Sequence, residues 1–475
     1  MDYSKLNLRI GLEIHQQINT TKLFCNCPSE LREDNPDFML KRKLRAASGE
    51  LGEVDVAAQF EVAKNKEIFY EGYRNTTCLI ETDECPPLDV NQDALMIALQ
   101  VALLLKAEPV EESHVMRKIV LDGSNTTGFQ RTMLIARDGV LETSHGKVEI
   151  ATVCLEEEAA RKISETEKSI TYRLDRLGIP LIEITTKADI KTPEQCKEVA
   201  EKIGMILRST GKVKRGIGTI RQDINLSILN HPRVELKGFQ DLRIMPKVVD
   251  IEIERQRKLI DGKKKIISEV RKVNADGMTS FLRPIPGSAR MYPETDVNVI
   301  KFDRKLLLSI MLPELISDQA LKLEQQHNIQ PEFAREIVKR KLDYFEVLVA
   351  GFRNIEPDFI ARVIIDMPKE IRRRFNVDAS NLGFNEFKEV LLYLNSGEIA
   401  KEAVVELLAE VARGNKIEVS KFKNVNNNEL RKEIEKIVNQ NKGSTFNAVM
   451  GIAMQKFRGK IDGKKIADTV RELLK

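Results

Sequence analysis

The stretch LNLRIGLEIHQQI, from Leu6 to Ile18, constrains the fold more than any other part of the chain. Apolar and polar side chains alternate along it, and a period of two is typical of a strand with one buried and one polar face. Glu13 and His15 lie two residues apart in the polar series, so both side chains should project from the same face of a sheet. A carboxylate beside an imidazole can ligate a metal ion, and a solvated strand face is the alternative that so short a motif leaves open.

Two further segments place carboxylates within or at the ends of predicted strands. In IPLIEITT, Glu183 is the only acid in an apolar run, which predicts that its side chain faces inward. Glu156 and Glu157 end the strand-like segment VEIATVCLEE. Burying a carboxylate is costly unless the group is paired or bound to a metal, so Glu183 is the least surface-like acid in the chain.

A basic, glycine-containing loop precedes two more strands with polar faces. In GKVKRGIGTIRQDIN, Gly216 and Gly218 follow Lys214 and Arg215, a composition suited to phosphate groups, although the spacing matches neither a Walker loop nor a Rossmann fingerprint. The polar faces predict a concave, charged site, with a solvated sheet face as the alternative. Their side chains are Arg221, Asp223, Asn225 and Ser227 in the first strand and Glu235 and Lys237 in the second.

Four of the six cysteines are candidates for a zinc site. Cys25 and Cys27 form a C-x-C pair, and Cys78 and Cys85 could complete a set of four thiolates. Because Cys78 and Cys85 are not spaced as a tight second pair, inert free thiols are the alternative. The scattered distribution of the cysteines argues against a disulfide framework.

Length and composition indicate a soluble protein of several domains. A chain of 475 residues is too long for one hydrophobic core. No apolar run reaches the roughly 18 residues of a membrane span, and MDYSKLNLR lacks the apolar core of a signal peptide, so we expect a cytoplasmic protein without membrane contact. Residues 416–475 carry 14 Lys and Arg against 7 Asp and Glu, which suggests a polyanion bound at this end, with mere solubility as the alternative.

The order of the patterns predicts an α+β fold. Strand-like segments and turns, interrupted by helices at 91–105, 192–211 and 248–272, extend to about residue 300. Helical patterns follow, and three short amphipathic helices end the chain. We therefore expect an antiparallel-sheet cradle at 1–300, an all-α domain at 301–415 and a small basic helical tail at 416–475.

Several motifs, in this order, resemble one family. The chain is similar to the E-subunit family of archaeal glutamyl-tRNA(Gln) amidotransferases, which is related to the bacterial and organellar B subunits. The resemblance covers nearly the whole chain. The motifs are GLEIHQQINTTKLFCNCPSELRE, MRKIVLDGSNTTGFQRT, CLEEEAAR, RLGIPLIEI, GKVKRGIGTIRQDIN, RMYPETD and VMGIAMQKFRGKIDGKKIADTV.

The resemblance implies a kinase and transamidase activity. ATP would phosphorylate the glutamyl side-chain carboxylate of Glu-tRNA(Gln), and ammonia from a partner glutaminase would then displace phosphate to give Gln-tRNA(Gln). Magnesium would neutralise the phosphoryl oxygens, and the imidazole of His15 suggests that manganese is also accepted. The implied metal ligands are Glu13, His15, Glu157 and Glu183, with Glu156 as the alternative to Glu157 or its helper.

Other residues receive supporting roles. The nucleotide or the carboxylate would be positioned by Lys214, Arg221, Asp223, Asn225, Glu235 and Lys237. The terminal helices resemble the family's YqeY-like tail domain, which grips the outer corner of the tRNA. Its candidate contacts are Arg458, Lys460, Lys464 and Lys465.

The sequence shows no nucleophile arrangement for glutamine hydrolysis, which predicts a partner glutaminase. The resemblance implies an asparaginase-like partner, GatD, in a heterotetramer with two copies of each of the two proteins. Two departures from the family stand out. An insertion resembling a domain of bacterial aspartyl-tRNA synthetases is absent after residue 272, and the second C-x-x-C pair of zinc-containing bacterial B subunits is missing.

Three other interpretations remain open. The chain could be a B-type subunit that acts with an amidase partner on Glu-tRNA(Gln) or Asp-tRNA(Asn). It could also be a tRNA-binding scaffold without catalysis. A stand-alone zinc hydrolase would require zinc at Glu13 and His15.

Overall fold

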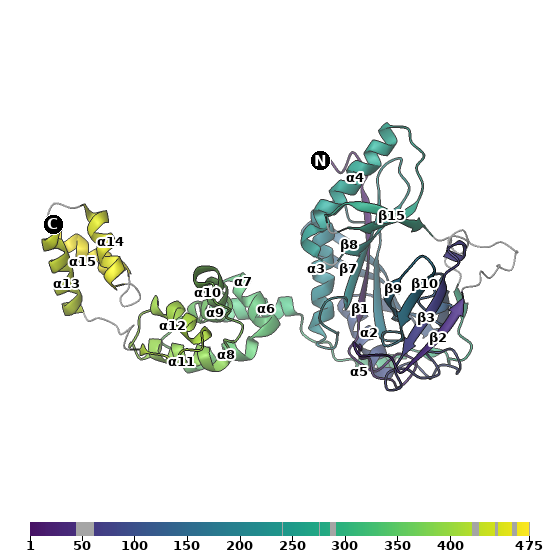
Figure 1. Ribbon diagram of the computed structural model, residues 1–475, viewed down its shortest axis with the longest axis horizontal. Coiled ribbons are helices and arrows are strands. Elements are labelled where there is room, and N and C mark those ends of the chain that lie inside the picture. The colour runs from purple at the N-terminus through teal and green to yellow at the C-terminus, as the bar shows by residue number, and fades with distance from the viewer. Residues whose placement is uncertain are drawn as a thin grey trace. The chain divides into compact units, whose positions relative to one another are not determined.

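The computed structural model describes residues 1–43, 61–239, 241–274, 276–285, 291–419, 427–441, 445–457 and 463–474. The chain divides into two compact units, Met1–Pro313 and Glu314–Lys475. The first unit combines sheets and helices, and the described part of the second is helical (Figure 1). The expectation of an α+β protein is therefore confirmed.

A large sheet forms the centre of the first unit. In the described residues it has eleven strands, ordered β15-β14-β13-β12-β1-β11-β8-β7-β6-β16, with β4 paired to β7. Strand β1 lies between β11 and β12 and is antiparallel to both. The strands are β1 (Arg9–Gln17), β4 (Glu108–Pro109), β6 (Val115–Ile119), β7 (Phe129–Thr143), β8 (Gly146–Glu157), β11 (Pro180–Thr186), β12 (Ile220–Ser227), β13 (Val234–Phe239), β14 (Glu269–Val273), β15 (Thr279–Pro284) and β16 (Met291–Pro293).

The alternation that predicted β1 matches its burial. Ile10, Leu12 and Ile14 are fully buried, whereas Glu13 and His15, which follow Leu12 and Ile14, are partly exposed. Helix α3 (Pro193–Ser209) packs on β1, and α2 (Gln92–Leu104) packs on β7 and β8. Helices α3 and α4 (Met245–Asp261) lie along one side of the large sheet (Figure 1). One face of the sheet is thus a hydrophobic layer under helices, which leaves the polar series of β1 on the other face.

Helix α3 begins where the sequence predicts. The Thr192 hydroxyl accepts a hydrogen bond of 3.0 Å from the backbone N–H of Gln195, and Pro193 occupies the first turn. The helix predicted at 248–272 extends too far. Helix α4 ends at Asp261, and Lys263 takes a left-handed conformation with φ 48°. Residues 269–273 form β14 instead, because β13 and β15 offer hydrogen-bond partners on both sides.

Smaller elements complete the first unit. A four-stranded sheet has the order β2-β3-β10-β9, and its core contains Ile68, Tyr70 and Tyr172. The elements are β2 (Phe38–Lys43), β3 (Glu67–Gly72), β9 (Arg161–Glu165), β10 (Ser169–Arg173), the pair β5 (Glu112–Ser113) and β17 (Ile300–Lys301), a 3-10 turn at Leu242–Ile244, and α5 (Arg304–Ser309).

The second unit contains two separate hydrophobic cores. One includes Ile337, Phe345 and Phe387, and the other includes Leu430 and Val470. All described helices of the chain are too short or too polar to cross a membrane. The first core lies among α6 (Ile316–His327), α7 (Pro331–Arg340), α8 (Leu342–Gly351), α9 (Pro357–Ile365), α10 (Met367–Phe375), α11 (Phe384–Asn395) and α12 (Ala403–Ala412), and the second among α13 (Asn427–Gln440), α14 (Phe446–Phe457) and α15 (Gly463–Leu473).

Truncation of Ile14 to alanine should destabilise the first unit by about 2–5 kcal/mol, because the fully buried side chain leaves a cavity between β1 and its helices. Urea unfolding followed by circular dichroism measures the change. Ile217→Ala is the control, since Ile217 is 95% exposed and its loss should cost at most about 0.5 kcal/mol. Equal destabilisation by the two substitutions would contradict the assigned faces.

Candidate active site

Strand pairing gathers polar side chains on the face of the large sheet opposite α3. His15 lies opposite Glu183 of β11 and Arg221 of β12, and Glu13 lies opposite Asp223. Directly paired residues in neighbouring strands project from the same face. Residues far apart in the sequence therefore meet across β1, as the alternation in each strand predicted.

Two overlapping groups of potential metal ligands result. One group is His15, Glu156 and Glu183, and the other is Glu13, His15 and Asp223; within each, ligand atoms lie within 4.8 Å of one another. The Nε2 atom of His15 is 3.2 Å from Glu183 Oε2 and 3.5 Å from Glu13 Oε1. Carboxylate oxygens with one imidazole nitrogen suit magnesium or manganese.

Two lysines reach into this face from neighbouring strands. Lys118 Nζ, on β6, is 3.3 Å from Glu183 Oε2 and 3.4 Å from Glu156 Oε1. Lys237 Nζ, on β13, is 2.6 Å from carboxylate oxygens of both Asp223 and Glu235. Lys237 was predicted from its strand. Lys118 was not, although it stands in the quoted motif MRKIVLDG, because nothing local shows which strand β6 adjoins.

The group has more negative than positive charges. Five carboxylates, those of Glu13, Glu156, Glu183, Asp223 and Glu235, face two ammonium groups and one imidazole. Such an excess favours binding of a divalent cation.

The pKa values follow from this crowding. Burial, together with the charge of Glu183, raises the pKa of Glu156 to about 7. Burial would also raise the pKa of Glu183, but the hydrogen bond from His15 and the charge of Lys118 outweigh it and hold that pKa below its usual range. Burial would lower the pKa of Lys118, but Glu156 and Glu183 raise it. Of Glu156 and Glu183, Glu183 is therefore the carboxylate that keeps its charge to the lower pH.

Glu157 does not join this group. Successive residues of β8 face opposite sides of the sheet, so Glu156 points toward His15 and Glu157 points away. Glu157 accepts a 2.9 Å hydrogen bond from the backbone N–H of Arg131, whose side chain also pairs with it at 3.4 Å and with Glu294 at 2.8 Å. The structure thus places Glu156, the alternative ligand, beside His15 and Glu183, and it places Glu157 elsewhere.

The remaining predicted positions differ in their surroundings. Arg221 pairs with Glu158 at 2.7 Å. Asn225 lies opposite Glu235 and Gly11 on the charged face. The ammonium group of Lys214 donates to the backbone carbonyl of Ser29 and not to the carboxylates of the charged face. Burial lowers the pKa of Lys214.

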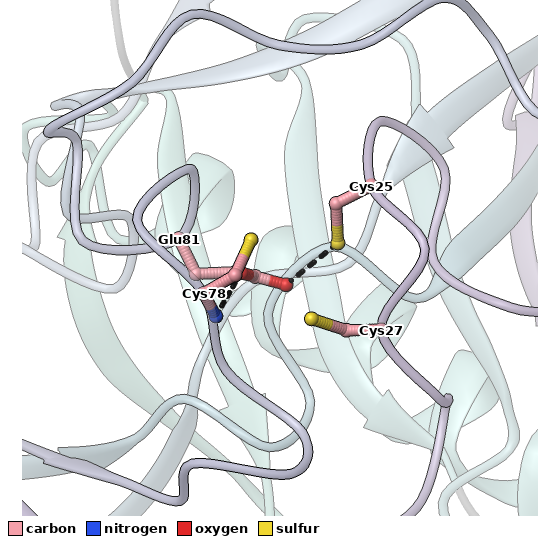
Figure 2. Close-up of side chains that lie close together, drawn as sticks. All are labelled: Cys25, Cys27, Cys78 and Glu81. Carbon is pink, nitrogen blue, oxygen red and sulfur yellow. Dashed lines mark hydrogen bonds between the residues drawn. The ribbon is translucent and has the colours of Figure 1, made fainter.

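The predicted set of four cysteines also differs from what the structure shows. Cys25, Cys27 and Cys78 converge, and the fourth member of this cysteine cluster is Glu81 (Figure 2). Cys85 is exposed and lies outside the cluster. The signal for Glu81 was its spacing, because Cys78-Leu-Ile-Glu81 has the length of a C-x-x-C pair.

Comparisons with known proteins agree with this architecture. Residues 8–308 match the family model of the GatB/GatE catalytic domain, and residues 343–474 match the GatB domain. The chain belongs to the GatB/GatE family. The resemblance expected from the sequence motifs is thereby confirmed.

The similar members of the GatB/GatE family include several archaeal proteins, each named as the E subunit of glutamyl-tRNA(Gln) amidotransferase. Identity is 37% to the protein of Methanocaldococcus jannaschii and 36% to that of Archaeoglobus fulgidus, over 100% of this chain and 99% of each relative. The Methanosarcina barkeri protein is 35% identical over 100% of this chain and 98% of its own length. The first alignment spans 627 positions against 475 residues here, in agreement with the missing insertion.

Within the second family match, the basic tail is described in part. Lys465 is exposed on α15 and Lys464 lies in the same helix. Arg458 and Lys460 lie outside the described residues.

The substitution Arg131→Met should destabilise this GatB/GatE family member by about 3–5 kcal/mol, because it leaves the buried carboxylate of Glu157 without its cation and that of Glu294 with Arg117 alone. Thermal unfolding at neutral pH measures the loss. Arg137→Met on the same strand is the control; its side chain is 64% exposed and its pair with Asp138 should contribute at most about 1 kcal/mol. A loss for Arg131→Met no larger than for the control would refute the structural role of the pair.

Proposed function

We propose that this chain is the kinase and transamidase subunit of a tRNA-dependent amidotransferase acting on Glu-tRNA(Gln). The observation that carries the proposal is the group of His15, Glu156 and Glu183, with Lys118 beside it, on the charged face of the sheet. Family membership and the relatives' printed names support the substrate class.

The chemistry has two steps. The glutamyl carboxylate attacks the γ-phosphorus of ATP, the bond to the β,γ-bridging oxygen breaks, and an acyl phosphate and ADP form. Ammonia then attacks the acyl carbon, phosphate leaves, and a proton is lost to give the side-chain amide. The first step brings together two anions, so it needs positive groups that position and neutralise the phosphoryl oxygens.

The side chains present fit that need. His15, Glu156 and Glu183 would hold one divalent cation, magnesium or manganese, and Glu13 with Asp223 would border it. When bound, the cation would neutralise phosphoryl oxygens. Lys118 and Lys237, each held by two carboxylates, are placed to orient anionic oxygens of ATP or of the glutamyl group.

Partners follow from the second step and from the substrate. Ammonia would come from an asparaginase-like glutaminase, GatD, in a heterotetramer with two copies of each protein. The basic tail, including Lys465 and Lys464, would contact the tRNA backbone.

The first prediction concerns catalysis. ATP hydrolysis by the purified chain with magnesium should be stimulated by Glu-tRNA(Gln), and Glu183→Gln should lower that stimulated rate by about 100-fold or more, because a ligand of the cation loses its charge. Glu149→Gln is the control, since Glu149 is exposed and its partner is the surface residue Lys187. Circular dichroism checks that both variants fold.

The outcomes separate the candidate functions. Stimulation that Glu183→Gln loses and Glu149→Gln keeps would support the kinase assignment. Binding of tRNA without stimulation, even after the glutaminase partner is added, would favour a scaffold that has lost catalysis. Stimulation retained by Glu183→Gln would contradict the metal ligand.

A second prediction concerns the cation itself. Magnesium or manganese should raise the melting temperature of the metal-free chain, because a ligand that binds the folded state stabilises it. Glu156→Gln should weaken this shift, and Glu149→Gln should not. An equal shift in all three proteins would place the cation elsewhere.

A third prediction concerns the tail. If Lys465 contacts a phosphate, Lys465→Ala should weaken tRNA binding and reduce the slope of log K against log salt concentration by about 1. Lys436→Ala is the control, because Lys436 on α13 is already paired with Glu433 at 2.7 Å. An unchanged slope in Lys465→Ala would exclude that contact.

A further inference from the structure

A positively charged group lies beside the proposed cation site on the same face of the sheet. Arg221 of β12 lies opposite His15, and its side chain is partly exposed. Its Nη2 atom donates to Glu158 Oε1 at 2.7 Å. Glu158 comes directly after β8, two residues beyond Glu156, so alternation along the extended chain keeps the two carboxylates on one face. The guanidinium group of Arg221 therefore adjoins the cation site.

The carboxylate that holds Arg221 is itself firmly held. Glu158 is only 1% exposed. Its Oε2 atom accepts a hydrogen bond of 3.1 Å from Nε2 of Gln17, which lies two residues after His15 on β1. Its Oε1 atom accepts from Arg221 and, at 3.3 Å, from the backbone N–H of Ala159. A buried carboxylate with three donors cannot turn without losing hydrogen bonds, so it fixes the end of the Arg221 side chain.

The surroundings of Glu158 have more positive than negative charge. Arg176 donates to the two backbone carbonyls that follow Glu158, at 2.9 Å each, and is a second guanidinium group beside it. Burial would raise the pKa of Glu158, but the charges of Arg221 and Arg176 outweigh it and hold that pKa below its usual range. One carboxylate thus faces two guanidinium groups, whereas Lys118 and Lys237 each lie between two carboxylates.

The basic loop before β12 extends this positive region. The loop is tied at both ends to Gln17, whose carbonyl accepts from the backbone N–H of Lys214 and whose N–H donates to the carbonyl of Thr219, at 2.9 Å each. Within the loop and just before it, Arg215 and Lys212 are exposed. A positive region of this extent fits a ligand with several negative charges, such as a polyphosphate, better than a single carboxylate.

We propose that Arg221, held in place by the buried carboxylate of Glu158, binds a phosphate oxygen of ATP beside the cation site. In the part of the chain that the structure describes, the one hydrogen bond of this guanidinium group is that from Nη2 to Glu158. Its planar fork therefore keeps donors for an oxyanion. Glu158 is a positioning residue, because it acts through Arg221. The identity of the nucleotide rests on the proposed function, whereas the anion site rests on the contacts of Arg221.

Calorimetric binding of ADP with magnesium to the full-length chain, alone and with its glutaminase partner, tests the site. Arg221→Met should weaken ADP binding about tenfold or more, because a hydrogen bond between charged groups is lost. Arg221→Lys keeps the charge but not the planar fork, so it should restore only part of the affinity, and it decides the question if Arg221→Met does not fold. Arg137→Met is the control, since Arg137 is exposed and pairs with Asp138, and it should leave the affinity unchanged.

The sign of a second effect tests the positioning role of Glu158. Glu158→Gln removes a negative charge, which by itself would tighten ADP binding, but it also loosens Arg221, and we expect binding to weaken about threefold or more. In the Arg221→Met background the same substitution should weaken binding no further, because Glu158 acts through Arg221. Tighter binding in Glu158→Gln, or full additivity in the double variant, would overturn the positioning role.

Binding and turnover separate this inference from the proposed function. If ADP binding requires Arg221 but Glu-tRNA(Gln) stimulates no ATP hydrolysis, the anion site stands and the proposed function fails. If stimulation requires Glu183 but Arg221→Met binds ADP as the unmodified chain does, the proposed function stands and this inference is overturned. A raised KM for Glu-tRNA(Gln) with an unchanged KM for ATP in Arg221→Met would assign Arg221 to the glutamyl carboxylate and would also overturn it.

Discussion

The antiparallel register of β1 between β11 and β12 is the constraint on which the charged face depends. It sets His15 opposite both Glu183 and Arg221, and it brings Asp223 beside Glu13. A shift of one residue would turn the polar series of β1 toward the helices and the buried series toward solvent. Because Ile10, Leu12 and Ile14 are fully buried, hydrophobic packing fixes the register, and the register in turn positions the polar groups.

Alternation within β8 separates two charged networks with different consequences. Glu156 belongs to the net negative group on one face, where burial and the charge of Glu183 raise its pKa to about 7. Glu157, one residue later, is matched by Arg131 on the other face. Burying carboxylates without an equal number of positive partners disfavours folding. The group around Glu156 has two lysines for five carboxylates, so binding of a cation would be favourable there. The proposed cation site and the buried ion pair with Arg131 thus use neighbouring residues of one strand.

Loops, rather than strands, carry the cysteine cluster of Cys25, Cys27, Cys78 and Glu81. Glu81 accepts from the backbone N–H of Cys78 and pairs with Lys22, and the four side chains converge although none of them lies in a helix or strand. Cys25 and Glu81 line the same pocket as Arg131 and Glu157. The cysteine cluster therefore lies near the ion pair of Arg131 with Glu157, on the side of the sheet away from His15. The helical unit contributes its own two cores and, on its last helix, the exposed Lys465.

Local patterns determined β1, α3 and the terminal helices, because alternation, capping and apolar stripes depend only on neighbours in the chain. They also placed Glu13, His15 and Glu183 on polar or inward positions. They could not choose between Glu156 and Glu157, which are adjacent acids until strand pairing assigns them to opposite faces. Nor could they find Lys118 or prevent 269–273 from being taken for helix, and the spacing of Glu81 from Cys78 did not by itself distinguish Glu81 from Cys85. Those outcomes were decided by the tertiary structure, since contacts between distant segments determine which side chain fills a position and which backbone finds a partner.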